Sequence, residues 1–230
     1  MQTISLLFHD VYVADPRDSG FATSGADRYK LPVKDFDAQL AGLARVRSDA
    51  PRLIVDMTGE PRVTGGLTAS AKATAVRRSF TRRRKASGYC ADDGHSGHTR
   101  IPYLFTVDDG GVSYYTFVAD RLEERGWRGH CFVSTDAIDT RGFLSSGQIR
   151  ELDRRGHVIG SHSASHPSRF SSCAPSRMNE EWARSRSVLE DLLGHEVRTA
   201  SLPGVVMPSS RPWRDTTKGM NSISLRRPLI

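Results

Sequence analysis

The stretch IPYLFTVDDGG, residues 101–111, is an apolar run that ends in two aspartates and two glycines. A continuous apolar run of this length is typical of a strand that is buried on both faces in a parallel sheet. Asp-Asp-Gly-Gly alone also suits a simple turn that caps the next helix. The alternative is a catalytic pair. Because successive strand residues point to opposite sides, one of Asp108 and Asp109 can bind a cation while the other handles a proton.

The residues after this run alternate between helix and strand patterns. Steps of three and four residues between apolar positions predict the helices, and short apolar runs predict the strands. The predicted helices cover residues 113–127, 145–156 and 176–194, and the predicted strands cover residues 101–107, 129–135, 157–161 and 197–204. Repeated β-α-β units form a parallel sheet with right-handed crossovers. The sequence therefore predicts an α/β fold, either an open sheet or a barrel.

The amino-terminal residues fit the same fold class. ISLLFHDVYV, residues 4–13, begins with a strand-like run that ends at His9 and Asp10. Residues 31–46 carry apolar side chains at helical spacing, and RLIVDM, residues 52–57, is an expected second strand. With 230 residues, the chain is long enough for one domain with a substantial core.

Residues 57–100 have a different composition, rich in Gly, Ser, Thr, Ala, Arg and His and without a helix or strand period. Eight cations and no acid lie between Arg62 and Lys85, so the net charge of +7 belongs to this segment and the rest of the chain carries −1. A confined cationic run is usually solvated, which argues against nucleic acid as a partner. We therefore expect a basic loop or insertion that is disordered.

The sequence gives no indication of a membrane or disulfide-rich protein. No apolar run approaches the roughly 18 residues that a membrane span needs. The amino-terminal residues include neither a cationic leader nor a small-residue cleavage site, so we expect a cytoplasmic protein. The three cysteines are scattered, without metal-type pairing. Nothing in the sequence indicates an oligomeric state.

A second informative stretch is IGSHSASHP, residues 159–167, which places His162 and His166 four positions apart. On a helix this spacing puts both imidazoles on one face, where they reach a single metal ion. The alternative is two polar side chains that share a helix face without a ligand. Two histidines and one carboxylate form a facial set that suits zinc or another first-row metal and leaves positions open for water and substrate.

The candidate chemical groups all follow predicted strands. Asp108 and Asp109 follow one strand, and His162 follows another two βα units later. In parallel α/β folds the carboxyl ends of the strands share one face, where ligands bind. We therefore expect these segments to converge.

Two further residue pairs fall on the same predicted face. His9 and Asp10 end the first strand, and Pro203 and Gly204 end the last one. All four are candidates for substrate contact. For His9 and Asp10, the alternative is an ordinary pair of turn residues at the end of a strand.

Together, these motifs and their order resemble the polysaccharide deacetylases, the NodB-homology family of carbohydrate esterases (carbohydrate esterase family 4). TVDDG, residues 106–110, is similar to the first motif of the family, Thr-Phe-Asp-Asp-Gly, and HSASH, residues 162–166, is similar to the second, His-Ser/Thr-x-x-His. The resemblance covers residues 101–204 and extends loosely to the predicted helix and strand before residue 47. It implies a distorted, incomplete (β/α) barrel.

Carried over residue by residue, the resemblance implies that Asp109, His162 and His166 hold a divalent metal ion, with zinc the expected one. It also implies that Asp108 is the base that activates the metal-bound water. That water attacks an acetamide carbonyl of an N-acetylated glycan, the expected substrate. Metal, water and base are what amide hydrolysis needs, and the same chemistry extends to O-acetyl esters of sugars.

The chain departs from the family pattern in its last third. Ser201 stands where the third motif, Arg-x-Pro-Gly, has an arginine that orients the catalytic aspartate. The late Leu-x-His motif, whose histidine acts as general acid, has no counterpart after Gly204. His195 lies in a loop before the last predicted strand, so we do not assign it that role. The alternative function is therefore an impaired deacetylase-like domain that binds metal or glycan without turnover.

We hypothesise that the fold is truncated by an irregular, out-of-frame tail, and that the basic segment, which has the same unpatterned composition, shares this origin. The coding DNA tests this hypothesis. The predicted organisation is an amino-terminal strand and helix (1–56), the basic insertion (57–100), the catalytic core (101–204) and the tail (205–230).

Overall fold

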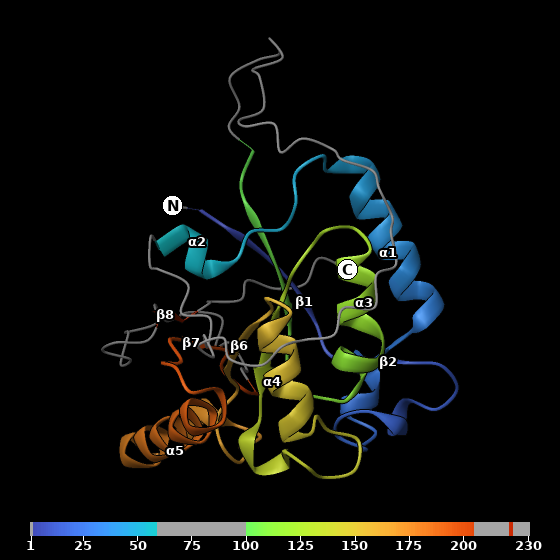
Figure 1. Cartoon of the computed structure of the whole chain (residues 1–230). Coiled ribbons are helices and arrows are strands. Elements are labelled where there is room, and N and C mark those ends of the chain that lie inside the picture. The colour runs from blue at the N-terminus through green and yellow to red at the C-terminus, as the bar shows by residue number, and fades with distance from the viewer. Residues whose placement is uncertain (1, 59–99, 205–220, 223–230) are drawn as a thin grey trace, which may run out of the picture.

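The computed structural model describes residues 2–58, 100–204 and 221–222, and its centre is a curled sheet (Figure 1). The strands lie in the order β1-β4-β5-β6-β7-β8, and every neighbouring pair is parallel. These strands are β1 (Ile4–Phe8), β4 (Tyr103–Val107), β5 (His130–Val133), β6 (Val158–Ser161), β7 (Thr199–Ala200) and β8 (Asn221–Ser222). A small second sheet pairs β2 (Val11–Tyr12) with β3 (Leu31–Pro32).

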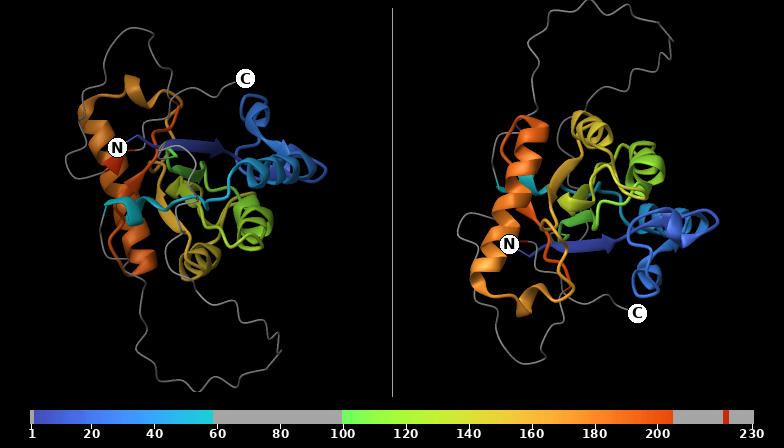
Figure 2. Two further views of the ribbon diagram at one scale, coloured as in Figure 1. Left: turned by 90° about the horizontal axis from the view of Figure 1, so that it is seen from above. Right: turned by 90° about the horizontal axis from the view of Figure 1, so that it is seen from below.

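Helices pack around this sheet. In the view from above, α1, α3, α4 and α5 form an arc around the strands (Figure 2). The helices are α1 (Val33–Val46), α2 (Ile54–Thr58), α3 (Ala119–Glu123), α4 (Ser146–Arg154) and α5 (Pro175–Leu193). Parallel strands require crossovers of this kind. The predicted α/β class is confirmed, and its form is the distorted, incomplete (β/α) barrel that the resemblance implies.

Local signals in the sequence set the ends of the helices. Ser145 and Gln148 form a capping box before α4: the Gln148 N–H donates to Ser145 Oγ at 3.2 Å, and the Ser145 N–H donates to Gln148 Oε1 at 2.8 Å. Helix α5 starts with Pro175 and ends before Gly194, whose φ of 74° is the left-handed conformation of a helix C-cap. The predicted helices over residues 145–156 and 176–194 are therefore confirmed.

The predicted second strand at residues 52–57 is wrong, because Ile54–Thr58 form α2. The segment is instead fixed by burial of Leu53 and by a hydrogen bond from the Ile54 N–H to His130 Nε2 at 3.0 Å. The predicted helix at residues 113–127 is present, but it begins as a π-helical turn, Tyr114–Val118.

Much of the predicted insertion and tail lies outside the described residues, at positions 59–99, 205–220 and 223–230. Their predicted disorder, solvation and origin stay predictions. Two residues of the tail form β8, which pairs with β7. Within the described ranges, no helix has the length and hydrophobicity needed to cross a membrane.

The centre of the sheet places the candidate site. Every residue of β4 is buried, and the Phe105 ring stacks on Phe8 of β1 with the centroids 4.6 Å apart. The register pairs Phe8 with Val107, so the residues that follow, His9 and Asp108, leave the two strands at the same edge. This edge is the carboxyl end of the sheet, as predicted for the site.

Candidate active site

Asp108 and Asp109 leave β4 in a tight turn. Asp109 has a φ of 76° and Gly110 a φ of 80°, both in the left-handed region that aspartate tolerates and glycine favours. A side chain at Gly110 would come within 3.1 Å of the Val133 side chain at the end of β5. The turn therefore depends on glycine, and it gives the two adjacent carboxylates different surroundings.

His162 and His166 lie on the loop after β6. The predicted helix at these residues is absent. Ser163 and His166 have φ values of 63° and 51°, so the backbone reverses instead of continuing as a helix. The His166 N–H donates to Ser163 Oγ at 3.1 Å, which closes the loop. The two imidazoles nonetheless come together, with their ring centroids 5.0 Å apart.

Both imidazoles meet Asp109. His162 Nε2 lies 3.4 Å and His166 Nε2 lies 3.3 Å from Asp109 Oδ1. Ligand atoms about 2.1 Å from a tetrahedral zinc ion lie about 3.4 Å from one another, so these separations fit a shared cation. In the part of the chain that the structure describes, these side chains form the one group of His, Cys, Asp or Glu residues whose ligand atoms are close enough to hold a metal ion.

A backbone hydrogen bond sets the orientation of the His162 ring. Its Nδ1 lies 3.0 Å from the carbonyl oxygen of Ser201, so Nδ1 carries the proton and donates it. In the neutral ring, the Nε2 lone pair then faces Asp109. Burial lowers the pKa of His162, but the charges of Asp108 and Asp109 outweigh burial and raise the pKa above its usual value. A cation at this position competes with that proton.

Asp108 is buried beside this group and has different contacts. Ser201 Oγ donates to Asp108 Oδ2 at 2.9 Å, whereas Oδ1 is buried without a hydrogen-bond partner among the described residues. Burial raises the pKa of Asp108 against the opposing effect of His162. Burial also acts to raise the pKa of Asp109, but its contacts with His162 and His166 hold that pKa well below the usual range. One carboxylate thus stays charged, and the other has an oxygen free to accept a proton.

Asp10, one of the predicted substrate contacts, is bonded within the protein. It is 2% exposed, and its Oδ1 accepts hydrogen bonds from Ser19 Oγ at 2.6 Å and Ser113 Oγ at 2.8 Å. These contacts hold the amino-terminal loop against the turn after β4, and substrate contact by Asp10 stays a prediction. His9 packs its ring against Tyr29 with the centroids 5.2 Å apart, and its substrate contact stays a prediction.

Pro203 and Gly204 form the turn after β7. Pro203 is buried, and Gly204 is exposed with a φ of 57°. A side chain at Gly204 would come within 2.3 Å of the Ser168 carbonyl oxygen, so this turn lies against the segment just after His166. Substrate contact by either residue stays a prediction.

Comparison with known proteins identifies the family. A family model described as polysaccharide deacetylase matches residues 96–221, more than half of the chain. The chain belongs to the polysaccharide deacetylase family. No curated protein matches the sequence significantly. The family match of this deacetylase continues past Gly204, further than the motifs in the sequence could be followed.

Solved structures share the fold of this deacetylase. The Streptococcus pyogenes deacetylase PplD, in complex with acetate, has a TM-score of 0.59 at 16% identity, with 88% of this chain and 74% of PplD covered. IcaB from Ammonifex degensii has a TM-score of 0.55 at 20% identity, covering 90% and 76%. The polysaccharide deacetylase BC0361 from Bacillus cereus has a TM-score of 0.57 at 16% identity, covering 87% and 50%. At these low identities, the structural similarity supports the fold alone. The roles of single residues rest on the geometry of the site.

The deacetylase site includes residues that the sequence motifs do not mark. Ser201 departs from the third motif, yet it contacts both the aspartate and the histidine motif. The Phe21 ring packs against His166 with the centroids 4.7 Å apart. Glu181 of α5 binds the backbone of the histidine loop. No periodicity or motif marks Phe21 and Glu181, because their contacts arise only when distant segments fold over the site.

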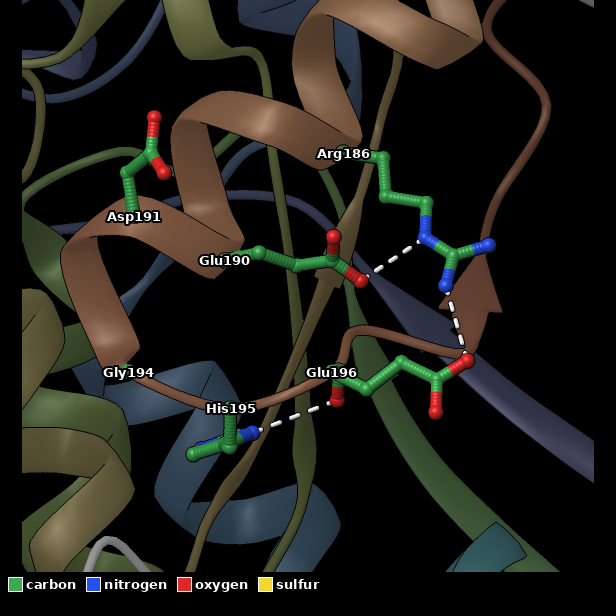
Figure 3. A pocket seen from close by; sticks show the side chains of 6 residues that line it. All are labelled: Arg186, Glu190, Asp191, Gly194, His195 and Glu196. Carbon is green, nitrogen blue, oxygen red and sulfur yellow. Dashed lines mark hydrogen bonds and ion pairs between the residues drawn. The ribbon is translucent and has the colours of Figure 1, made fainter.

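His195 of the deacetylase follows the carboxyl end of α5, whereas Glu181 lies in the first half of that helix. There it lines a polar hollow of charged side chains (Figure 3). Arg186 contacts Glu190 and Glu196 at 2.8 Å each, and His195 Nε2 lies 3.1 Å from Asp153 Oδ1. These paired charges form a surface network, so the placement of His195 gives no reason to assign it a catalytic role.

Proposed function

We propose that this chain is a metal-dependent hydrolase that removes N-acetyl groups from a polysaccharide or oligosaccharide. The observation that supports this proposal is the convergence of Asp109, His162 and His166 beside a buried carboxylate, Asp108, that has one oxygen without a partner among the described residues. The family membership supplies the substrate class, an acetylated glycan. O-acetyl groups of sugars are open to the same chemistry.

Asp109, His162 and His166 are the residues that would hold the metal ion, which we propose to be zinc. Two imidazole nitrogens and one carboxylate oxygen are a donor set of catalytic zinc sites, and they leave room for water and substrate. When bound, the ion polarises the acetyl carbonyl and lowers the pKa of water to about 7. Asp109 contributes the negative charge, and the Ser201 carbonyl keeps the His162 ring in the tautomer that a ligand needs.

Asp108 is the proposed general base. Its Oδ1 takes a proton from the attacking water, while Ser201 Oγ holds Oδ2 in place. The water oxygen bonds to the acetyl carbon, and Asp108 passes its proton to the leaving nitrogen as the carbon–nitrogen bond breaks. The acetic acid so formed gives its proton to the free amine, and acetate and a protonated amine are released. We assign no separate general acid among the described residues.

Ser201 gives this site a neutral donor where the resemblance leads one to expect an arginine. A hydroxyl orients the carboxylate without placing a positive charge beside it. Because a neighbouring cation would lower the pKa of a carboxyl group, Ser201 leaves burial as the dominant influence on Asp108. A raised pKa favours proton acceptance, which is the task of a base.

Acetate release from an N-acetylated chito-oligosaccharide tests the proposal. We expect release by the zinc-loaded full chain, loss of activity with a chelator, and recovery when zinc is added back. Asp108→Asn is the matched control: it keeps all three ligands, so it should bind zinc and release no acetate. Bound zinc without acetate release by the unaltered chain would overturn the enzymatic proposal and favour the binding-only alternative.

A further inference from the structure

Glu181 is a buried carboxylate that the proposed reaction does not use. It lies on α5, and its side chain is 1% exposed. A buried charge is costly unless hydrogen bonds and opposite charges compensate it. The partners of Glu181 show what this charge does for the protein.

The backbone of the histidine loop supplies most of these partners. The N–H groups of Ala164 and Ser165 both donate to Glu181 Oε2, at 3.0 and 2.7 Å. Ser165 Oγ donates to Oε1 at 2.7 Å. Two successive N–H groups that converge on one oxygen form an anion-binding turn. Both residues lie between the two histidines, so Glu181 contacts the loop at its middle.

The segment after β5 also forms hydrogen bonds with the backbone of the histidine loop. The N–H groups of Thr135 and Asp136 donate to the carbonyl oxygens of Ser163 and Ala164, at 3.3 and 3.0 Å. The loop therefore lies between the segment after β5 and helix α5. A loop with left-handed residues has no regular ladder to pair its backbone, so it needs such outside partners.

Two arginines also lie beside Glu181. Arg177 Nη2 lies 2.6 Å and Arg184 Nη2 lies 4.0 Å from Glu181 Oε1. Burial acts to raise the pKa of Glu181, but the hydrogen bonds from Ser165 and the charge of Arg177 outweigh burial and hold the pKa below its usual value. An ionised carboxylate accepts N–H bonds more strongly than a neutral group does.

We propose that Glu181 is a positioning residue that sets the geometry of His162 and His166 for metal binding by holding the backbone between them. The inference rests on the proposed metal site. Loss of an outer partner of a metal ligand typically weakens metal binding by about 10- to 100-fold. Glu181 acts on two ligands through one loop, so its removal should weaken zinc binding within that range.

Competition with a chromogenic zinc chelator, on the full chain, tests this proposal. We expect Glu181→Ala to bind zinc about 10- to 100-fold more weakly, and Glu181→Gln to lie between it and the unaltered chain, because the amide oxygen still accepts hydrogen bonds. Glu180→Gln is the matched control, because Glu180 precedes Glu181 in the sequence and also pairs with Arg177, but its side chain is exposed to solvent. Its zinc affinity should stay within twofold of the unaltered chain.

Amide hydrogen exchange of the metal-free proteins gives a second measurement. The Ala164 and Ser165 amides should exchange faster in Glu181→Gln than in the unaltered chain, while the β4 amides stay protected. This variant also serves if Glu181→Ala does not fold. Unchanged zinc affinity together with unchanged loop exchange in Glu181→Gln would overturn the inference. Failure of the unaltered chain to bind zinc would instead overturn the proposed metal site, and exchange would then show by itself whether Glu181 holds the loop.

Discussion

Buried histidines flank β6 at both ends, and the two ends of the sheet use their histidines differently. At the amino end, His157 uses both ring nitrogens within the protein: Nδ1 lies 2.8 Å from the Tyr114 hydroxyl, and Nε2 lies 3.0 Å from Glu123 Oε1. His130 likewise uses both nitrogens, on backbone groups of Phe105 and Ile54. Such rings have no lone pair to spare for a ligand.

At the carboxyl end, His162 uses only Nδ1 on the backbone, and its Nε2 faces Asp109 together with Nε2 of His166. Burial alone therefore does not separate a structural histidine from a candidate metal ligand. The difference lies in whether the second nitrogen is already taken and whether it converges with other donors.

The largest expected difference between the two ends is in metal binding. We expect His162→Ala to abolish zinc binding, because it removes one of the three proposed ligands. His157→Gln should retain zinc, since His157 lies at the other end of β6. Zinc content after dialysis, measured by atomic absorption, checks both variants. Equal zinc in His162→Ala and the unaltered chain would remove the proposed site.

The amino-end histidines should instead control stability in acid. Burial lowers the pKa of His130 and of His157 to about 4. The unfolded chain takes up these protons near pH 6.5, whereas the folded chain does so only near pH 4. The contribution of these two groups to the free energy of unfolding should therefore be fully present above about pH 6.5. It should fall as the pH drops from about 6.5 to about 4, by about 1.4 kcal/mol per pH unit for each group.

Urea unfolding at pH 7.0, 6.0 and 5.0 measures this dependence. In His157→Gln, the slope between pH 6 and pH 5 should be smaller, because one of the two groups is gone. The variant should also lose about 1–3 kcal/mol at pH 7, since the buried Tyr114 hydroxyl loses a partner. Identical slopes in the variant and the unaltered chain would contradict the assignment of the acid sensitivity to His157.

The last expected effect concerns Ser201, which contacts both motifs at the carboxyl end. Hydrogen bonds to charged groups contribute about 1.5–3 kcal/mol, so Ser201→Ala should lower kcat by about 10- to 150-fold. Zinc affinity and KM should change little, because His162 contacts the backbone carbonyl of residue 201, which alanine retains. Ser201→Thr should restore kcat. An unchanged kcat in the alanine variant would show that Ser201 does not position Asp108.

Local patterns predicted the elements that carry the site. The apolar run before Asp108 formed a buried strand, and the shared carboxyl edge of a parallel sheet brought Asp109 and His162 together as expected. The conformation of the histidine loop was not predictable from spacing, because the left-handed φ of His166 ends any helical continuation. The prediction that His162 and His166 lie close together is confirmed, but a loop brings them together and a helix does not.

Long-range packing explains the other differences. Asp10 is buried because Ser19 and Ser113, far apart in the sequence, close around its carboxylate. The apolar run at residues 52–57 forms α2 and no strand, because burial of Leu53 and the hydrogen bond from the Ile54 N–H to His130 fix it against β5. Glu181 looks like any other charge of an amphipathic helix until the loop folds against it. None of these contacts leaves a periodic signal in the sequence.

X-ray absorption spectroscopy of the zinc-loaded full chain tests the central claim most directly. Coordination by Asp109, His162 and His166 predicts a first shell with two imidazole nitrogens at about 2.0–2.1 Å and the remaining positions filled by oxygen at about 2.0–2.2 Å. The same shell should persist in Asp108→Asn. A shell without imidazole, or one that changes when Asp108 is replaced, would contradict the assignment of ligands and base.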